Sequence, residues 1–239
     1  MPDSNKHWPL ILGVFLFAGL AVLGFFLSSA LIEFKQFERS VTVKGLSERE
    51  YPADIVIWPI QFTAASNNIE GLYSAIDSST RQITGFLSDK GIDSGEISIS
   101  SPAITDKLAQ QYGGNMKPEF RYTALQTVTV YSTNIDNVRA VMSSLSELGK
   151  KGIVFTVDNY QAQTEYLFSR LNEVKPEMIE EATRNAREVA EKFASDSQSS
   201  LGKIKRASQG QFSIRPRDKN NPHIKTVRVV STIEYYLSD

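Results

Sequence analysis

A single long apolar run stands near the start of the chain, and alternating apolar and polar positions follow it. Residues 10–32 contain no charged side chain. About 20 apolar residues in a helix, rising about 1.5 Å each, cross a hydrocarbon core of roughly 30 Å. The pattern predicts a transmembrane helix over residues 10–32, a spacer over 33–39 and one water-facing domain over 40–239.

The residues that flank the apolar run indicate its orientation. The N-terminal flank carries Lys6, His7 and the free amine, with Asp3 as its one acidic residue, whereas the charges just after the run cancel. The positive-inside rule then predicts a cytoplasmic segment over 1–9 and an exported body. A cleaved signal peptide is the alternative, because residues 28–30 (Ser-Ser-Ala) offer small side chains before a cut. A run of this length favours an uncleaved signal anchor.

Strand and helix periods follow one another through the rest of the chain. A helix begins after Asn67 or Asn68 and ends before Gly91, where a left-handed residue is typical. Other helices are predicted over 134–149 and 172–200. The predicted strands cover residues 40–45, 54–64, 96–105, 120–131 and 153–168, and a C-terminal hairpin joins 204–214 to 225–237.

This order of elements predicts an α+β fold. The middle of the chain has the order β-α-β-β-α-β, which closes into an antiparallel sheet with both helices on one face. A long amphipathic helix and a C-terminal β-hairpin follow this sheet in the chain. Pro59 cannot donate to a ladder, so it predicts an edge or a bulge. We expect Ile97 and Ile99 to point inward and residues 106–119 to form a mobile hairpin arm.

The helix over 172–200 is expected to pack on a sheet. Its stripe includes several small alanines and lacks a leucine heptad, which argues against a coiled coil. Pro176 must lie in its first turn or mark a kink. Glu180–Arg184 and Glu188–Lys192 are i,i+4 pairs in the favourable order. The predicted inward positions are Met178, Ile179, Ala182, Ala186, Val189, Ala190 and Phe193.

Composition removes several classes of chemistry. The chain has no cysteine, which excludes disulfides, thiol catalysis and cysteine metal sites. Its net charge of −1 provides no global attraction to nucleic acid. The two histidines, His7 and His223, lack a partner at metal-ligand spacing, and solvated histidines are the simpler interpretation. We expect no catalytic residue, no metal and no cofactor.

The C-terminal region carries the one local excess of charge. Its candidate interaction surface consists of Arg215, Arg217, Lys219 and Lys225, opposed nearby only by Asp218. Such a surface suits anionic lipid or an acidic face of a neighbouring subunit. A solvated hairpin, whose charges keep an edge from pairing, is the simpler interpretation. Nucleic acid is not expected, because no aromatic platform lies in this stretch.

Three segments resemble one protein family. They are Val41-Thr42-Val43-Lys44-Gly45 followed by Ala53-Asp54-Ile55, Arg121-Tyr122 leading into 127–130, and the Ala- and Arg-rich residues 181–194 followed by Leu201-Gly202. Together they are similar to the SIMPL-domain family over nearly all of residues 40–237. The resemblance implies a bacterial inner-membrane protein, single-pass, with its C-terminal domain in the periplasm. Some relatives form large oligomers, and some are linked to oxidative stress tolerance.

Three functions therefore compete. The first is a non-enzymatic, membrane-tethered protein that assembles with itself and supports envelope integrity; its partners are the bilayer, through residues 10–32, and further copies. The second is an exported binding module whose cleft, between the sheet and the long helix, takes a small apolar or anionic ligand. The third is an enzyme of unrecognised type, which without cysteine has no peroxidatic thiol.

Overall fold

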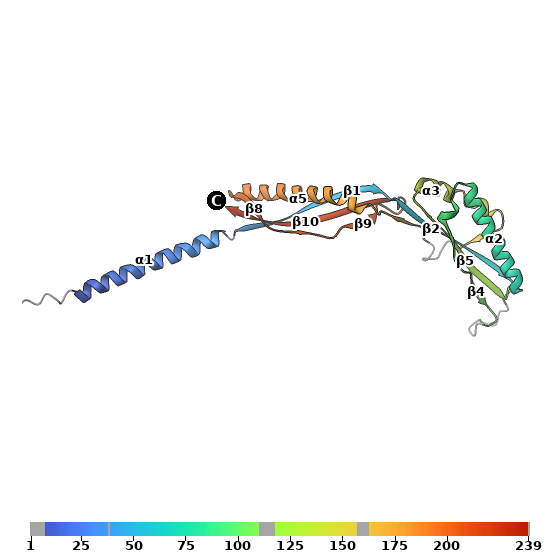
Figure 1. Ribbon diagram of the computed structural model, residues 1–239, viewed down its shortest axis with the longest axis horizontal. Helices are drawn as coiled ribbons and strands as arrows, with labels where there is room; N and C mark the ends of the chain where they lie inside the picture. The colour runs from blue at the N-terminus through green and yellow to red at the C-terminus, as the bar shows by residue number, and fades with distance from the viewer. Residues whose placement is uncertain (1–7, 38, 110–117, 157–162, 239) are drawn as a thin grey trace, which may run out of the picture. The chain divides into compact units, whose positions relative to one another are not determined.

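The computed structural model describes residues 8–37, 39–109, 118–156 and 163–238 (Figure 1). Its contacts divide the chain into two compact units, each made of segments far apart in sequence. The first unit comprises Met1–Glu48, Lys175–Phe212 and Arg228–Asp239, and the second comprises Arg49–Val174 and Ser213–Val227. Most of the hairpin arm predicted over 106–119 lies outside the described residues.

The helix α1 (Trp8–Phe37) is the one described helix that is long and apolar enough to cross a membrane. Its apolar window, Leu10–Ala30, has a mean hydropathy of 2.7, and none of it is buried. A signal sequence at an N-terminus has the same properties. The helix continues to Phe37, so it includes most of the residues expected as a spacer.

The second unit contains the predicted β-α-β-β-α-β sheet. Its strands are antiparallel and have the order β3-β5-β2-β6, with β4 beside β5 and β7 beside β2. The α+β prediction is confirmed. The elements are β2 (Ile55–Ser66), α2 (Ile69–Asp89), η1 (Ser94–Glu96), β3 (Ile97–Ile99), β4 (Ala103–Asp106), β5 (Tyr122–Ser132), α3 (Ile135–Ser143), α4 (Ser146–Gly149), β6 (Val154–Phe155) and β7 (Glu165–Leu167).

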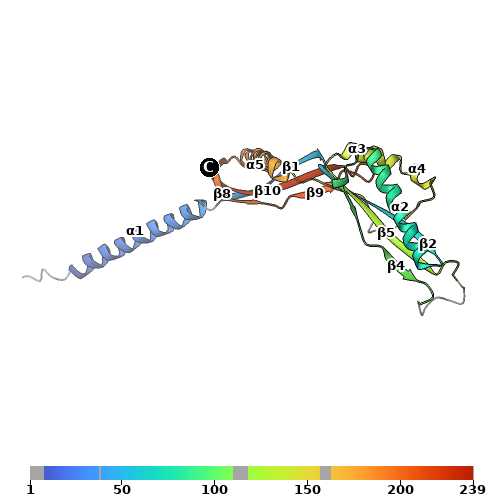
Figure 2. The ribbon, with the colours of Figure 1, turned by 45° about the vertical axis from the view of Figure 1, so that its right-hand side comes forward.

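One hydrophobic core holds this unit together. Alternate residues of β2 point toward α2 and α3, which lie on the same side of the sheet (Figure 2). Removing these side chains from water is the main favourable term in folding. The buried residues on β2 and the two helices include Val56, Trp58, Ile60, Phe62, Leu72, Ile76, Ile83, Val138 and Val141.

Both ends of the helix α2 lie where the sequence predicts them. The Asn68 side chain accepts a hydrogen bond from the Glu70 N–H at 2.9 Å and so satisfies one of the free donors of the first turn. Gly91 has a φ of 83°, a conformation that glycine adopts without steric cost. Both predictions are confirmed.

Two predicted strands are interrupted. The strand over 96–105 is divided into β3 and β4 around Pro102, and Ile99, expected to point inward, is 52% exposed. The strand over 153–168 appears as β6 and β7, with residues 157–162 outside the described part. β7 pairs with residues 55–57 of β2 and β6 with residues 62–63, so on that side the described pairing stops before Pro59 and resumes after it. The segment between β6 and β7 includes residues 157–162, outside the described part, so the edge or bulge expected at Pro59 stays a prediction on this side.

The helix expected over 134–149 is broken at two serines. The hydroxyls of Ser143 and Ser144 donate back to the Ala140 carbonyl at 2.6 and 3.2 Å. Such bonds offer the backbone an alternative to the helical ladder. As a result α3 ends at Ser143, and α4 begins separately at Ser146.

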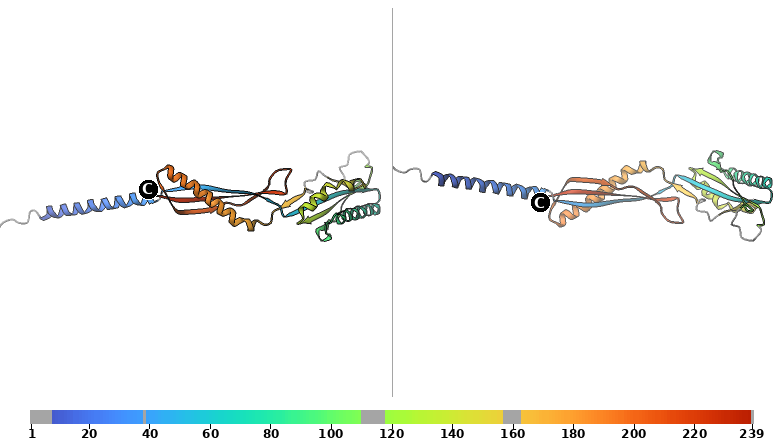
Figure 3. Two further views of the ribbon diagram at one scale, coloured as in Figure 1. Left: turned by 90° about the horizontal axis from the view of Figure 1, so that it is seen from above. Right: turned by 90° about the horizontal axis from the view of Figure 1, so that it is seen from below.

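The first unit is a helix on a small sheet. The strand β10 (Ile224–Ser238) lies in the middle, between β1 (Ser40–Pro52) and β8 (Ser200–Gln209). It also pairs with the short strand β9 (Ser213–Pro216), which belongs with the first residues of β10 to the second unit. The predicted hairpin is thus present, with its first arm divided into β8 and β9. The helix α5 (Leu171–Asp196) lies across the strands (Figure 3).

A stripe of small residues on α5 faces β1. Met178, Ala182, Ala186, Ala190 and Ala194 are buried at a spacing of four residues. Val189 and Phe193, predicted to point inward, are instead 37% and 56% exposed, since the helix turns its alanine face to the sheet. Pro176 lies beyond the first turn, inside the helix, which corrects the prediction for that residue.

Gly45 explains why this face is made of alanines. A Cβ atom at Gly45 would overlap the Ala182 carbonyl oxygen and the Ala186 nitrogen. The backbones of β1 and α5 therefore lie closer together than any side chain at position 45 would allow. Two hydrogen bonds hold the same contact: Ser47 Oγ donates to Glu181 Oε2, and Asn185 Nδ2 donates to the Leu46 carbonyl, each at 2.8 Å.

Candidate functional site

The four residues of the predicted interaction surface differ in their exposure and in their partners. Arg215 lies on β9 and is exposed, and Lys219 is exposed in the turn that precedes β10. Arg217 lies in the same turn, whereas Lys225 on β10 is only 7% exposed. Of the four, only Arg215 and Lys219 present cations that are exposed and have no partner among the described residues.

Arg217 is held by acidic neighbours. Its guanidinium lies 3.0 Å from Asp218 Oδ2 and 3.6 Å from Glu50 Oε2. Asp218 also accepts hydrogen bonds from the backbone N–H groups of Asn220 and Asn221, both at 2.8 Å. These bonds, with the Arg217 contact as the largest, lower the pKa of Asp218 to about 2. The Arg217 charge therefore organises its own turn.

Lys225 has a different environment. Burial lowers the pKa of its ammonium group, and the nearby Glu165 acts to raise it. A lysine stem that packs against apolar neighbours while its charge faces a carboxylate is a common arrangement. Lys225 is thus a buried cation near Glu165 of β7 and is not part of an exposed basic patch.

A polar junction that the sequence did not identify as a site lies where β1 ends and β2 begins. The Asp54 carboxylate accepts hydrogen bonds from the Ser169 backbone N–H at 2.8 Å and from Ser169 Oγ at 2.6 Å, and Arg170 Nε lies 3.5 Å away. Burial acts to raise the pKa of Asp54, but the Ser169 bonds and the Arg170 charge outweigh it and the pKa is lowered. Asp54 stays ionised at neutral pH.

Two contacts between aromatic rings and a backbone hydrogen bond lie next to this junction. The Tyr51 and Phe168 rings are stacked at 5.3 Å, and the Tyr166 and His223 rings meet edge to face at 6.1 Å. The Ala53 N–H donates to the His223 carbonyl at 2.8 Å. Burial lowers the pKa of His223, and Arg139 acts in the same direction.

The hydrogen bonds of the junction hold two chain segments together and do not activate a nucleophile. A serine nucleophile needs a base that takes its proton, and a carboxylate with a lowered pKa is a weak base. The Ser169 hydroxyl is donated to that carboxylate. Asp54 stands inside one of the segments that carry the family resemblance, but its partner is 115 residues away, so no local spacing reveals the contact.

A groove of about 500 Å³ lies in the first unit between α5 and β8. Arg187 is tied to Glu191 at 3.0 Å, while Arg184 and Lys203 have no partner among the described residues. The predicted pairs Glu180–Arg184 and Glu188–Lys192 are not among the ion pairs of the described residues, and Arg187–Glu191 forms instead. The lining residues are Glu180, Thr183, Arg184, Arg187, Gly202, Lys203, Ile204 and Tyr235.

Tyr235 is the most buried polar residue of this groove. It is 3% exposed, and its hydroxyl has no hydrogen-bond partner among the described residues. Burial raises the pKa of the hydroxyl, Arg187 acts to lower it, and Glu191 acts to raise it. The hydroxyl is therefore a protonated donor at neutral pH that faces a groove lined by cations.

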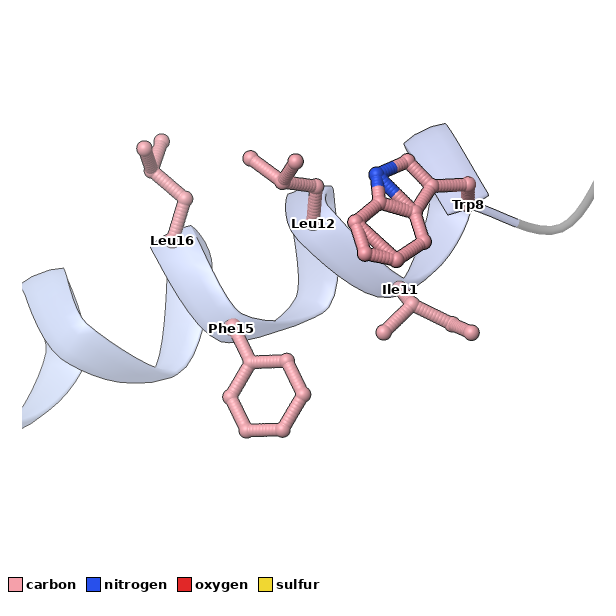
Figure 4. A pocket seen from close by; sticks show the side chains of 5 residues that line it. All are labelled: Trp8, Ile11, Leu12, Phe15 and Leu16. Atoms are coloured by element: carbon pink, nitrogen blue, oxygen red, sulfur yellow. The ribbon is translucent and has the colours of Figure 1, made fainter.

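A second hollow lies on α1 and is apolar. Figure 4 shows its five side chains, Trp8, Ile11, Leu12, Phe15 and Leu16, all from one helix. Apart from the Trp8 indole they offer no polar group, so the hollow supplies no chemistry. In the described part of the chain no group of three or more His, Asp or Glu side chains has the arrangement of a metal site.

Comparisons with known proteins agree with the residues noted in the sequence. A family model described as SIMPL, protein of unknown function (DUF541), matches residues 41–232. The match begins at Val41 in β1 and ends within β10, so it includes strands and helices of both units. A search of the curated proteins gives no match.

Proposed function

The chain belongs to the SIMPL family, and from this premise we propose that it is a membrane-anchored periplasmic protein of the bacterial inner membrane. In this role it acts by assembling with copies of itself and supports the integrity of the envelope under stress. Catalysis is not part of the proposal, because the Ser169 hydroxyl is engaged by an ionised carboxylate.

The observation that carries the anchor is the character of α1. Its apolar window of 21 residues is exposed on every side, which is unfavourable in water and favourable in lipid. The cations before the run support an N-terminus in the cytoplasm. The α+β domain would then lie on the opposite side of the membrane.

The argument for assembly comes from the edges of the first unit. Among the described strands β8 pairs only with β10, and of its ten residues only Leu201 is partly buried. β1 forms the opposite edge of the same sheet. Two open edges on one sheet allow a head-to-tail contact, and such a contact generates rings or filaments. Arg206 lies on the β8 edge and would have to meet an acidic side chain, whereas Lys205 already pairs with Glu234 at 3.1 Å.

The location is tested by a reporter that is active only outside the cytoplasm. Alkaline phosphatase fused after Asp239 is expected to be active, and a cytoplasmic fluorescent reporter at the same position is expected to be dark. The intact mass of the membrane-bound product distinguishes an anchor from a cleaved signal. Activity of the cytoplasmic reporter alone would contradict the proposed location.

Assembly is tested by light scattering on the full chain in neutral detergent. We expect one defined oligomer at micromolar concentrations. Replacement of Ile204 by Lys adds a charge to the exposed edge and is expected to shift the mass toward the monomer, whereas Ile99→Lys, on the other unit, leaves it unchanged. A monomeric wild-type chain across the same range removes assembly from the proposal.

A further inference from the structure

We propose that the groove between α5 and β8 is a binding site for a phosphate group. This inference does not depend on self-assembly, because every residue of the groove belongs to the first unit of one chain. Its volume of about 500 Å³ lies in the range of small-ligand sites, which is roughly 300–1,000 Å³. The site would take a phosphate ester with a small organic part.

The charge of the groove selects an anion. Arg184, Arg187 and Lys203 line it, and Glu180 is the one acid among its described lining residues. Arg184 and Lys203 are exposed and unpaired within the described part, so their charges are available. Guanidinium groups bind phosphate oxygens in pairs, and ammonium groups act as point charges beside them.

Tyr235 adds a donor to this set of cations. It is 3% exposed as a whole residue and lines the groove. No buried side-chain oxygen or nitrogen among the described residues lacks a hydrogen-bond partner, so the Tyr235 hydroxyl, which bonds to no described residue, is reached by solvent. A phosphate oxygen in the groove would accept a hydrogen bond from this hydroxyl. The hydroxyl of Thr183, on the facing helix, supplies a further donor.

The organic part of the ligand has an apolar wall. Ile204 is 49% exposed and lines the groove beside Gly202. A Cβ atom at Gly202 would lie only 3.0 Å from the Tyr236 carbonyl oxygen, so β8 and β10 approach closely beside this wall. A glycerol or similar carbon skeleton attached to the phosphate would cover Ile204.

Two sources can supply such a phosphate, a soluble ester or a lipid headgroup. The covalent chain favours access to headgroups. Leu201 pairs with Leu237, and the Leu237 N–H donates to the Arg39 carbonyl at 2.9 Å. Arg39 follows the end of α1 at Phe37 by two residues, a distance of at most about 7 Å along the chain. The start of β8 is therefore tied close to the end of the apolar helix.

The proposal is tested with sn-glycerol 3-phosphate and the full chain in dodecyl maltoside, by titration calorimetry. We expect saturable binding that Arg184→Gln and Tyr235→Phe each weaken by about tenfold, the usual effect of losing one charge-assisted hydrogen bond. Lys192→Gln removes an exposed cation of the same helix outside the groove and is expected to leave the affinity unchanged. Tyr235→Phe keeps the ring and so the packing.

A second arm places the chain in nanodiscs of phosphatidylcholine with or without phosphatidylglycerol. If the lipid is the source, hydrogen exchange at residues 183–187 and 202–204 slows only with phosphatidylglycerol, and Arg184→Gln abolishes the change. Binding in the first arm identifies a soluble ester, and an effect in the second alone identifies the headgroup. No response in either arm, or equal responses from wild type, Arg184→Gln and Tyr235→Phe, overturns the proposal.

Discussion

Asp54 shows how one residue fixes the course of the chain. Its carboxylate accepts two bonds from Ser169 and lies beside Arg170, so it joins the start of β2 to the segment that leads into α5. The Asp54 N–H donates in turn to the Leu167 carbonyl at 2.9 Å. A small ionised side chain thus satisfies several polar groups at a place where the backbone leaves one sheet for another.

Replacing Asp54 by Ala is expected to lower the free energy of unfolding of the second unit by about 1–3 kcal/mol at pH 7, because the donors of Ser169 and Arg170 lose their acceptor. Trp58, buried in that unit, reports the change by fluorescence during chemical denaturation. Asp77→Ala, an exposed acid on α2, is the control and should change the value by less than about 0.5 kcal/mol.

The pH dependence of the free energy of unfolding of wild type and Asp54→Ala gives a second test. The pKa of Asp54 is lower in the folded protein than its ordinary value of 3.8, so its stabilisation is present above that value. As the pH falls through the folded pKa, the carboxylate is protonated and the stabilisation is lost. The difference between wild type and Asp54→Ala should narrow below about pH 4. A difference that is constant from pH 7 to pH 2 would contradict the assignment.

At the scale of elements, the close contact between β1 and α5 depends on the absence of a side chain at Gly45. Strand and helix meet backbone to backbone there, and the alanine stripe of α5 is the matching surface. This contact explains why a Val-Thr-Val-Lys-Gly strand and an alanine-rich helix occur together in the sequence. Larger side chains at either position would separate the two elements.

Gly45→Ala is expected to destabilise the first unit by about 1–3 kcal/mol or more, because the added methyl group meets helix backbone that cannot move alone. Faster hydrogen exchange at Ala182, Ala186 and Ala190 measures the effect. Gly85→Ala adds the same methyl group to α2, where nothing lies within 4 Å, and is expected to stabilise that helix by about 0.5–1 kcal/mol. Equal exchange in wild type and Gly45→Ala would show that the contact is not tight.

The sequence predicts the elements better than it predicts their partners. Local periods and caps give the β-α-β-β-α-β order, and Asn68 and Gly91 mark the ends of α2. Local patterns contain no information on which strand lies beside β1, or that Asp54 meets Ser169, because these contacts join segments far apart in the chain.

The same limit applies to the predicted interaction surface, where a count of cations does not show that Arg217 and Lys225 face nearby carboxylates. Serine back-bonding and the exposure of Val189 and Phe193 likewise depend on tertiary packing.

At the scale of the whole molecule, the proposed membrane anchor rests on α1. Replacing Leu20 by Arg places a charge near the middle of the apolar window, at a cost of about 2.5–3.5 kcal/mol in membrane insertion. We expect a larger fraction of the variant in the carbonate-extracted supernatant, measured by immunoblot. Leu20→Ile keeps the apolar surface and should remain in the pellet. Equal release of both variants would mean that α1 does not hold the protein in the membrane.

The central place of β10 has a consequence for biosynthesis. The ribosome makes β10 after β1, α5 and β8, yet β1, which is made soon after α1, pairs with it. β1 therefore remains without this neighbour, already outside the ribosome, until β10 has been translated. A chain that stops before Ile224 would leave both β1 and β8 without their common neighbour. Such truncated products would thus remain open to proteases, and only a chain translated through β10 could close its first sheet.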